Sequence, residues 1–162
     1  MDQKYTSEKT SRNQIAAGFK KVPWEPGTSN LDIGGGKYEK ASKYLYKEHS
    51  VVNFVYDPFC RAEEHNCDIL NLAPFDTCTL FNVLNVIEEA EVRAELLQLA
   101  KNKARLNGHV YIAVYEGDKS KNGKATRDGF QWNCLLSDFT PEITAVFPEA
   151  FIKNGVFVCK ND

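Results

Sequence analysis

Hydrophobic and polar positions alternate along the chain in blocks that are typical of strands and helices following one another. A short apolar stretch at 30–33 runs into three glycines, and apolar side chains then recur at helical spacing over 37–49. Residues 51–56 are rich in β-branched and aromatic side chains, and the turn pair Asp57-Pro58 closes this stretch. Because it is almost continuously apolar, we expect it to be a strand of a parallel sheet that helices cover on both faces.

The second half of the chain continues this alternation. Residues 65–70 predict a short third strand, residues 77–87 a fourth and residues 109–118 a fifth. The clearest predicted helix is 88–106, which is acidic at its front and basic at its rear and carries apolar residues on one stripe. Residues 119–129 are polar and rich in lysine, which predicts a loop.

The C-terminal part predicts helix and then a hairpin. Residues 130–147 are typical of one helix, or of two short helices broken at Pro141. After them, Asn154-Gly155 joins two short apolar runs, which is a strong signal for an antiparallel hairpin. The elements together predict an α/β domain with a mainly parallel twisted sheet, helices on both faces and a C-terminal antiparallel hairpin.

Composition and charge agree with one globular domain, because 162 residues suffice for a single core. We expect residues 1–28 to form a polar segment with a short helix around 13–20 and a linker, and residues 29–162 to form the domain itself.

A net charge of −2 gives no global basic field for nucleic acids. The sequence has no apolar run of membrane-spanning length and no signal peptide, which predicts a cytoplasmic location. The five cysteines include no C-x-x-C pair, which predicts reduced thiols and no metal site.

The glycine turn after the first strand is the first candidate for chemistry, because such turns let backbone amides approach a ligand closely. Gly34 and Gly36 fit the first two positions of the dinucleotide fingerprint G-x-G-x-x-G, but the third falls on Glu39, whose carboxylate would face a phosphate. A P-loop is excluded because no G-K-[ST] follows the glycines. Asp57 follows about 20 residues later, where an acidic side chain can accept both hydroxyls of a ribose. The pattern predicts a nucleoside ligand without a pyrophosphate.

Taken in order, the stretches LDIGGGKYEKASKYL, VVNFVYDP, CDI and FDTCTLFNVLNVIEE resemble the motif series of class I S-adenosylmethionine-dependent methyltransferases. The resemblance covers residues 30–117 and implies a Rossmann-like fold with S-adenosylmethionine (SAM) as the cofactor. Asp32, Gly34 and Gly36 match the family motif D/E-x-G-x-G-x-G, whereas Tyr38 replaces its last glycine.

The resemblance also implies roles for individual residues. The glycine turn would pack against the methionine portion of SAM, with Asp32 ordering its amino end, and Asp57 would hold the ribose. Asp68 would lie beside the adenine amino group, and Ile69 would line the ring. Three side chains would lie next to the transferred methyl, where the fourth strand ends: Phe81, Asn82 and Asn85. The cofactor-binding residues expected in this way are Asp32, Gly34, Gly36, Asp57, Asp68, Ile69, Phe81 and Asn82.

The sequence leaves the methyl acceptor open among a small molecule, a nucleic acid and a protein, and it leaves the oligomeric state open too. The stretch FNVL lacks the prolines typical of amino-methylating nucleic-acid enzymes, and Cys78 lies inside a strand rather than in the Pro-Cys pair of cytosine methyltransferases. Residues 83–100 more narrowly resemble methyltransferases associated with DNA phosphorothioation and small methyltransferases of phages and mobile elements.

Methyl transfer needs aligned groups more than it needs a reactive side chain. Position along the chain nevertheless suggests candidates for a base or orienting group and for recognition of the acceptor. The first set is Asn85, Tyr115, Glu116 and, less well placed, His109; the second is Arg127, Gln131, Trp132 and residues 12–14. The second set has the mixed polar and aromatic character of a lid.

A different class of function stays open: a protein that binds the cofactor or a nucleoside without catalysis, or an interaction protein on a methyltransferase scaffold. A concave polar and aromatic site formed by Asn85, Tyr115 and residues 127–133 would favour an enzyme, and a filled or flat surface would favour a binder. Asp57 also suits the start of a turn, and Asn82 and Asn85 suit capping of the following helix. A nicotinamide-binding domain is disfavoured by the acidic residue at the third fingerprint position.

Overall fold

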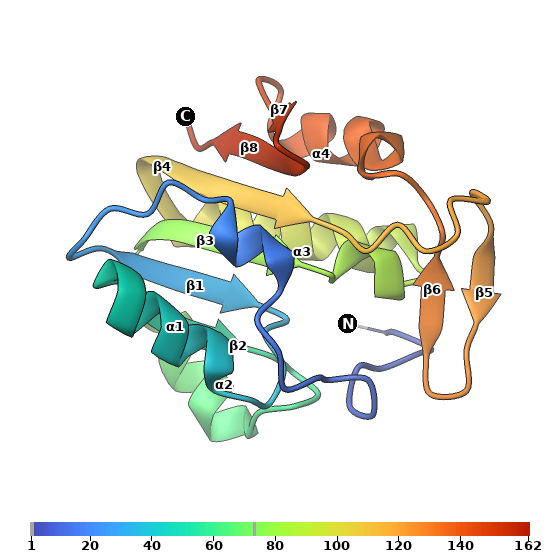
Figure 1. Ribbon diagram of the computed structural model, residues 1–162, viewed down its shortest axis with the longest axis horizontal. Helices are drawn as coiled ribbons and strands as arrows, with labels where there is room; N and C mark the ends of the chain where they lie inside the picture. The colour runs from blue at the N-terminus through green and yellow to red at the C-terminus, as the bar shows by residue number, and fades with distance from the viewer. Residues whose placement is uncertain (1, 73) are drawn as a thin grey trace.

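The computed structural model describes residues 2–72 and 74–162. Its main feature is a six-stranded sheet in the order β2-β1-β3-β4-β8-β7 (Figure 1). The first four of these strands are parallel, and both pairs that involve β8 are antiparallel. The strands are β1 (Ser29–Ile33), β2 (Val52–Tyr56), β3 (Phe75–Phe81), β4 (Ala104–Ala113), β7 (Phe151–Lys153) and β8 (Val156–Lys160). The expected α/β class, the mainly parallel sheet and the C-terminal hairpin are confirmed.

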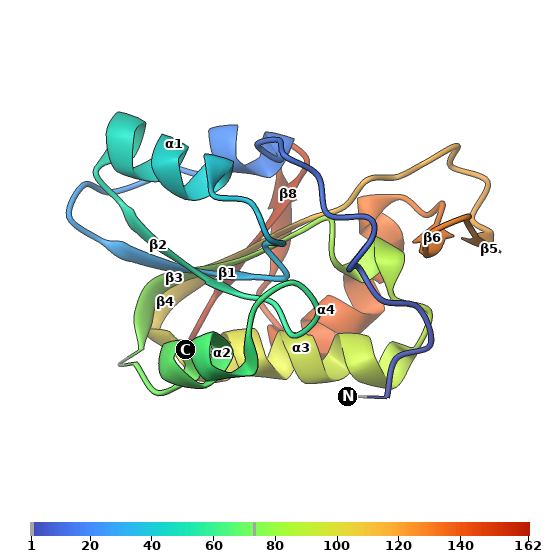
Figure 2. The same ribbon diagram turned by 90° about the horizontal axis from the view of Figure 1, so that it is seen from below.

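Helices cover both faces of the sheet (Figure 2). One face carries α1 (Lys40–His49) and a short 3-10 helix (Ala17–Lys20), which is all that forms of the helix expected around 13–20. The other face carries α2 (Glu63–Leu70), α3 (Ala90–Lys103) and α4 (Thr140–Val146). No helix among the described residues is long and apolar enough to cross a membrane.

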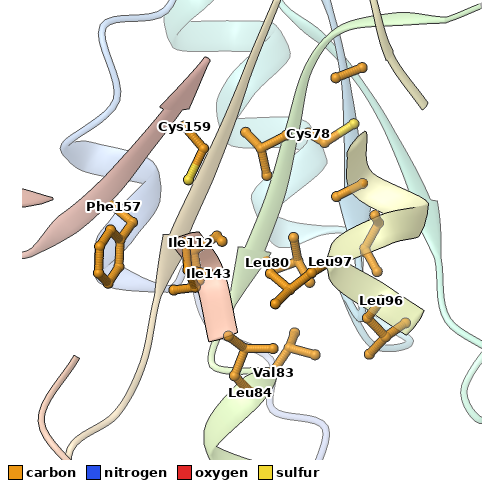
Figure 3. Close-up of a cluster of buried hydrophobic side chains, with 14 of the residues drawn as sticks. Cys78, Leu80, Val83, Leu84, Leu96, Leu97, Ile112, Ile143, Phe157 and Cys159 are labelled. Carbon is orange, nitrogen blue, oxygen red and sulfur yellow. The ribbon is translucent and has the colours of Figure 1, made fainter. Parts of the chain in front are cut away.

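The larger of two hydrophobic clusters lies between the sheet and the helices α3 and α4. Leu80 of β3 faces Leu97 of α3, and Ile112 of β4 lies beside Ile143 of α4, all four fully buried (Figure 3). A smaller cluster on the α1 face includes Phe81, because successive side chains of a strand point to opposite faces. The two clusters hold the carboxyl ends of the strands in fixed positions.

The expected third strand at 65–70 is wrong, since these residues belong to helix α2. Glu63 and Glu64 occupy its first turn, where acidic side chains favour a helix, and Asn66 and Ile69 are buried three residues apart. The apolar run was too short to distinguish a strand from a buried helical turn.

The expected helix over 130–147 is only partly correct. Its first residues form β6 (Phe130–Trp132), which pairs with β5 (Gly123–Ala125) inside the stretch expected to be a loop. A 3-10 helix (Leu136–Phe139) then leads into α4, and Pro141 lies in the first turn of α4, where its missing N–H leaves no hydrogen bond unmade. The change from the 3-10 helix to α4 falls between Phe139 and Thr140, one residue before Pro141.

The direction of winding changes at β1. The connection from β1 to β2 runs through α1 over one face, and the connection from β2 to β3 runs through α2 over the other (Figure 2). The loops after β1 and β3 therefore lead to opposite sides of the sheet. Such a switch point leaves a crevice at the carboxyl edge, where open α/β sheets bind ligands.

Candidate active site

The glycine loop after β1 adopts backbone angles that only glycine readily accepts. Gly34 and Gly36 have φ values of 76° and 75°. A Cβ at Gly34 would lie 2.7 Å from Val83 Cγ2, and the Gly34 N–H donates to the Tyr56 carbonyl at 2.7 Å. The loop thus passes closely between the end of β2 and the segment that follows β3.

Asp57, at the end of β2, fixes this loop. Its carboxylate is buried, and Oδ2 accepts the Gly36 N–H at 2.9 Å. Oδ1 accepts the N–H groups of Phe59 and Cys60, each at 3.0 Å, so Asp57 also starts a turn as the alternative interpretation expected. A carboxylate offers about four acceptor positions, so these three bonds leave space for one ligand hydroxyl.

Asp32 lies directly beneath the glycine loop, where a side chain at Gly35 would collide with its carboxylate. Thr79 Oγ1 donates to Asp32 Oδ1 at 2.9 Å, and Asn30 Nδ2 in turn donates to Thr79 Oγ1 at 3.1 Å. Burial raises the pKa of Asp32 to about 7, against the effect of the Thr79 hydrogen bond and with a further contribution from Asp57. Among the described residues no hydrogen bond reaches Oδ2 of this carboxyl group, and Arg61 favours the charged form only as the smallest of the contributions. A bound cation would lower the pKa further.

A cleft of about 450 Å³, part of it open to solvent, lies over these groups at the carboxyl edge of the sheet. Gly34, Asp57 and Asn82 line it, as the sequence predicted, together with the aromatic side chains Tyr56 and Phe59. Asn82 has a φ of 59° and is exposed.

The structure does not bring five of the eight predicted cofactor-binding residues into the lining of this cleft. Two of the five are close to it in the chain: Asp32 directly precedes Ile33, which lines the cleft, and Gly36 belongs to the same loop as Gly34.

The other three predicted cofactor-binding residues are Phe81, Asp68 and Ile69. Phe81 is buried on the opposite face, where its ring meets Phe19 edge-on with centroids 4.8 Å apart. Asp68 is exposed on α2, and Ile69 is buried in the core beneath α2. Both placements follow from the helix that replaces the expected third strand.

Arg61 holds the outside of the glycine loop and was missed from the sequence. Its Nε donates to the Gly36 carbonyl at 2.8 Å, and one terminal nitrogen donates to the Tyr38 carbonyl at 3.3 Å. The other terminal nitrogen forms an ion pair with Glu39. No local pattern predicts these contacts, because more than 20 residues separate Arg61 from its partners.

The predicted acceptor-binding residues lie beside this cleft. Asn85 is buried, and its Nδ2 donates to Gln131 Oε1 of β6 at 3.0 Å. Gln131 Nε2 donates in turn to the Tyr115 carbonyl at 2.9 Å. The structure therefore joins Asn85, Tyr115 and the 127–133 segment, three regions that the sequence proposed for one site.

A second, open hollow lies next to these residues, lined by Tyr115, Arg127 and Gln131 and by residues of the β5–β6 pair. Tyr115 is 63% exposed, and Arg127 is exposed and paired with Asp128 at 3.0 Å. This hollow contains Tyr115 and residues of the 127–133 segment, two of the three regions expected in a concave acceptor site, whereas Asn85 does not line it.

Several other candidates have structural partners. Glu116 Oε2 accepts the Leu136 N–H at 2.8 Å, and His109 lies within β4 and stacks on Tyr111. Trp132 Nε1 donates to the Ile87 carbonyl at 3.0 Å, and its ring packs against the core. Residues 12–14 are exposed.

Arg93 organises the segment before α3, which no sequence pattern indicated. The side chain is buried and donates to the carbonyls of Ile87 and Glu88, each at 2.9 Å. It also pairs with both carboxylate oxygens of Glu142, at 2.6 and 2.8 Å. This buried bidentate pair joins α3 to α4 and fixes the segment that carries Asn85.

Residues 2–12, which we call the N-terminal strap, form one wall of the cleft. The strap crosses from the start of α3 to the glycine loop (Figure 2). Its Gln3 and Ser7 line the cleft, and Tyr5 stacks on Phe130 of β6 with ring centroids 5.6 Å apart. Three hydrogen bonds hold it further: Lys4 N to Glu89 Oε1, Cys60 Sγ to the Ser7 carbonyl, and Lys37 N to Ser11 Oγ.

No protein-family model and no curated protein sequence matches the chain, whereas many solved structures do. CalO1, a methyltransferase in calicheamicin biosynthesis with S-adenosylhomocysteine (SAH) bound, matches 88% of this chain and 50% of its own at a TM-score of 0.57 and 14% identity. Phosphoethanolamine N-methyltransferase 2 of Haemonchus contortus, in complex with SAM, matches 85% of this chain and 37% of its own at a TM-score of 0.58 and 15% identity. CalS10, a SAM-bound amino pentose methyltransferase from Micromonospora echinaspora, matches 83% of this chain and 84% of its own at a TM-score of 0.53 and 13% identity.

The fold is therefore that of the class I, Rossmann-like SAM-dependent methyltransferases, as the sequence resemblance implied. At 13–15% identity, the fold is what the chain shares with these proteins. The chain spans half the length of CalO1 and most of the length of CalS10.

Proposed function

We propose that this protein is a SAM-dependent methyltransferase that binds the cofactor in the cleft over Gly34 and Asp57 and receives its acceptor from the side of the β5–β6 pair. The observation that carries the proposal is the hydrogen bond from the Gly36 N–H to Asp57, which joins the two cofactor motifs at the switch point of the sheet. Neighbours of the same fold with SAM or SAH bound support the choice of cofactor.

The residues present fit SAM. The Asp32 carboxyl group, beneath the loop, suits an ammonium group, because a cation there would favour the charged form that burial disfavours. The free acceptor position of Asp57 suits a ribose hydroxyl, and Tyr56 and Phe59 give the cleft apolar walls. When bound, SAM supplies a methyl group already activated by its sulfonium.

The chain's own contribution to the reaction is alignment. Asp32 and Asp57 would hold the two ends of the cofactor, and the closely packed Gly34 would leave its reactive centre beside the segment after β3. The Asn85–Gln131 pair would place the acceptor on the other side of that segment. Ordering the reacting groups in this way lowers the barrier without a strong base.

The direct test is calorimetric titration of the purified protein with SAM, SAH and NAD. Saturable binding of SAM and SAH, with none of NAD, is the expected result, because Glu39 and Arg61 form an ion pair at the start of α1, where a pyrophosphate would bind. Binding of NAD alone, or of none of the three, would contradict the proposal.

A second candidate is an interaction protein on a methyltransferase scaffold, which is favoured by the structural role that the three backbone hydrogen bonds give to Asp57. Transfer of a labelled methyl group from SAM to any member of an acceptor panel would exclude it. The cytoplasmic location and the relation to phage and mobile-element enzymes stay predictions from the sequence.

A further inference from the structure

Asn85 carries a polar atom without a partner in the interior of the protein. The residue is 1% exposed, and among the described residues no hydrogen bond reaches its Oδ1. A buried acceptor without a donor is destabilising, and proteins tend to keep such atoms only where another molecule supplies the donor.

The surrounding hydrogen bonds determine which end of the Asn85 amide is free. Gln131 Nε2 donates to two backbone carbonyls, those of Tyr115 at 2.9 Å and Trp132 at 2.6 Å. Its Oε1 must then accept, so Asn85 presents Nδ2 to it. The free atom is therefore a carbonyl oxygen, which needs an N–H or O–H group.

Asn85 lines neither the cleft over Gly34 and Asp57 nor the second hollow, but its neighbours connect it to both. Val83 and Val86, on either side of it in the chain, line the cofactor cleft, and its partner Gln131 lines the second hollow. Four residues further on, Glu89 Oε2 is also buried and receives no hydrogen bond from the part of the chain that the structure describes, while Glu89 Oε1 accepts the Lys4 N–H. The segment thus holds two free acceptors, one of them on a carboxylate.

We propose that the methyl acceptor is an amine, and that Asn85 Oδ1 receives a hydrogen bond from its nitrogen. A carboxylate on the same segment favours a donor of positive character over a neutral hydroxyl group or an anion. Amine and methyl group would meet beside Asn85, between the cleft that Val83 and Val86 line and the hollow that Gln131 lines. Access requires the contact of Tyr5 with Phe130 to open, since this contact closes the strap against the strand that carries Gln131.

This inference rests on the proposed function. The amine binds as an ammonium and first loses one proton to water in the open second hollow. The nitrogen lone pair of the neutral amine then forms the new bond to the methyl carbon, while the carbon–sulfur bond breaks and sulfur keeps its electron pair. The product ammonium then loses its proton to water in the open second hollow. Asn85 orients the nitrogen through its remaining N–H and takes no proton.

Sinefungin tests the proposal without knowledge of the acceptor, because it carries an amino group at the position of the SAM methyl. We expect wild-type protein to bind sinefungin at least about tenfold more tightly than SAH, since only sinefungin supplies the missing donor. Asn85→Leu should weaken the binding of sinefungin alone, so that its affinity approaches that of SAH. Asn85→Asp should keep the preference for sinefungin over SAH. Asn102→Leu, the same change on the exposed surface of α3, is the matched control.

The outcomes separate the two proposals. Binding of SAH without any preference for sinefungin in the wild type would overturn the amine inference and leave the methyltransferase proposal standing. A preference that persists in folded Asn85→Leu would also overturn it. Failure of both compounds to bind would overturn the proposed function, and the inference with it. The wild-type comparison decides the matter even if the substitution at this buried position prevents folding.

Discussion

Thr79 donates a hydrogen bond to the carboxyl group of Asp32, and burial raises the pKa of this group from 3.8 to about 7. The native state therefore keeps a proton that the unfolded chain loses near pH 4. Its contribution to stability is fully present below pH 4 and is lost as the pH rises to about 7, by up to ~4 kcal/mol in the free energy of unfolding.

Urea unfolding of wild type and Asp32→Asn at several pH values from 4 to 8 measures this effect. The wild type should lose stability relative to Asp32→Asn as the pH rises to 7, and the difference should be constant above that. The comparison isolates Asp32, because every other titrating group is common to both proteins. Parallel curves over this range would mean that Asp32 ionises normally in the folded state.

Asp57 combines a structural and a proposed cofactor-binding role, and substitution should reveal both. Asp57→Ala should weaken SAH binding by ~1–3 kcal/mol, since a charged acceptor is lost, and should lower the free energy of unfolding by a similar amount. Calorimetry and urea unfolding measure the two effects. The control is Asp118→Ala, which removes the same turn-type bond, to Ser120 N at 2.9 Å, on the exposed surface. Unchanged SAH affinity in folded Asp57→Ala would leave Asp57 with its structural role only.

The N-terminal strap is held more weakly than strand β1. Its attachments are a few hydrogen bonds near the surface and one aromatic stack, whereas β1 carries the fully buried Leu31. Segments with little buried apolar area open first in native proteins.

Hydrogen exchange tests this order of stability. Amides of residues 2–12 should exchange well before those of β1, and Tyr5→Ala should accelerate them further while β1 stays protected. SAH should slow their exchange, because the strap forms a wall of the cleft. Tyr46→Ala, at a 68% exposed position on α1, provides the control. Strap amides as protected as those of β1 would show that the cleft wall is part of the rigid fold.

The errors at the level of elements have a common physical origin. Long periodic segments such as α3 and nearly continuous apolar strands such as β2 were predictable, because their patterns exceed what chance produces. Short segments were not. Helix α2 and strand β6 each hold few residues, and tertiary contacts decide their conformation: α2 packs on β2, and β6 packs on the 3-10 helix Leu84–Val86.

At the scale of the whole molecule, motif order was enough to place Gly34, Asp57 and Asn82 in one cleft, since the carboxyl ends of parallel strands meet at one edge. It could not reveal contacts between distant segments. Arg61 on the glycine loop and the Asn85–Gln131 bond depend on loops whose paths follow from packing, and no spacing in the sequence encodes them. Phe81 was misplaced because its face of the strand could not be read from its neighbours.

The charge distribution of the whole molecule bears on the choice of acceptor. The net charge is −2, and most cations of the segment around β5 lie near carboxylates of the same region. These pairs are Lys119–Glu116 at 3.9 Å, Lys121–Asp138 at 3.5 Å and Arg127–Asp128 at 3.0 Å. Binding to a nucleic-acid backbone needs cations that can neutralise phosphates, and cations paired in this way are less available for it.

We therefore expect single-stranded DNA and RNA oligonucleotides to bind at physiological salt with dissociation constants no tighter than ~10⁻⁴ M, measured by fluorescence anisotropy. A variant with Asp128→Asn and Asp138→Asn, which frees Arg127 and Lys121, should bind more tightly and with a steeper dependence on salt. This variant serves as a positive control, because tighter binding by it would show that the assay can detect contact of an oligonucleotide with the β5–β6 pair. Micromolar binding by the wild type would contradict the expectation and would make a nucleobase amine the first acceptor to test, whereas weak binding directs the search to small amines and amino groups of proteins.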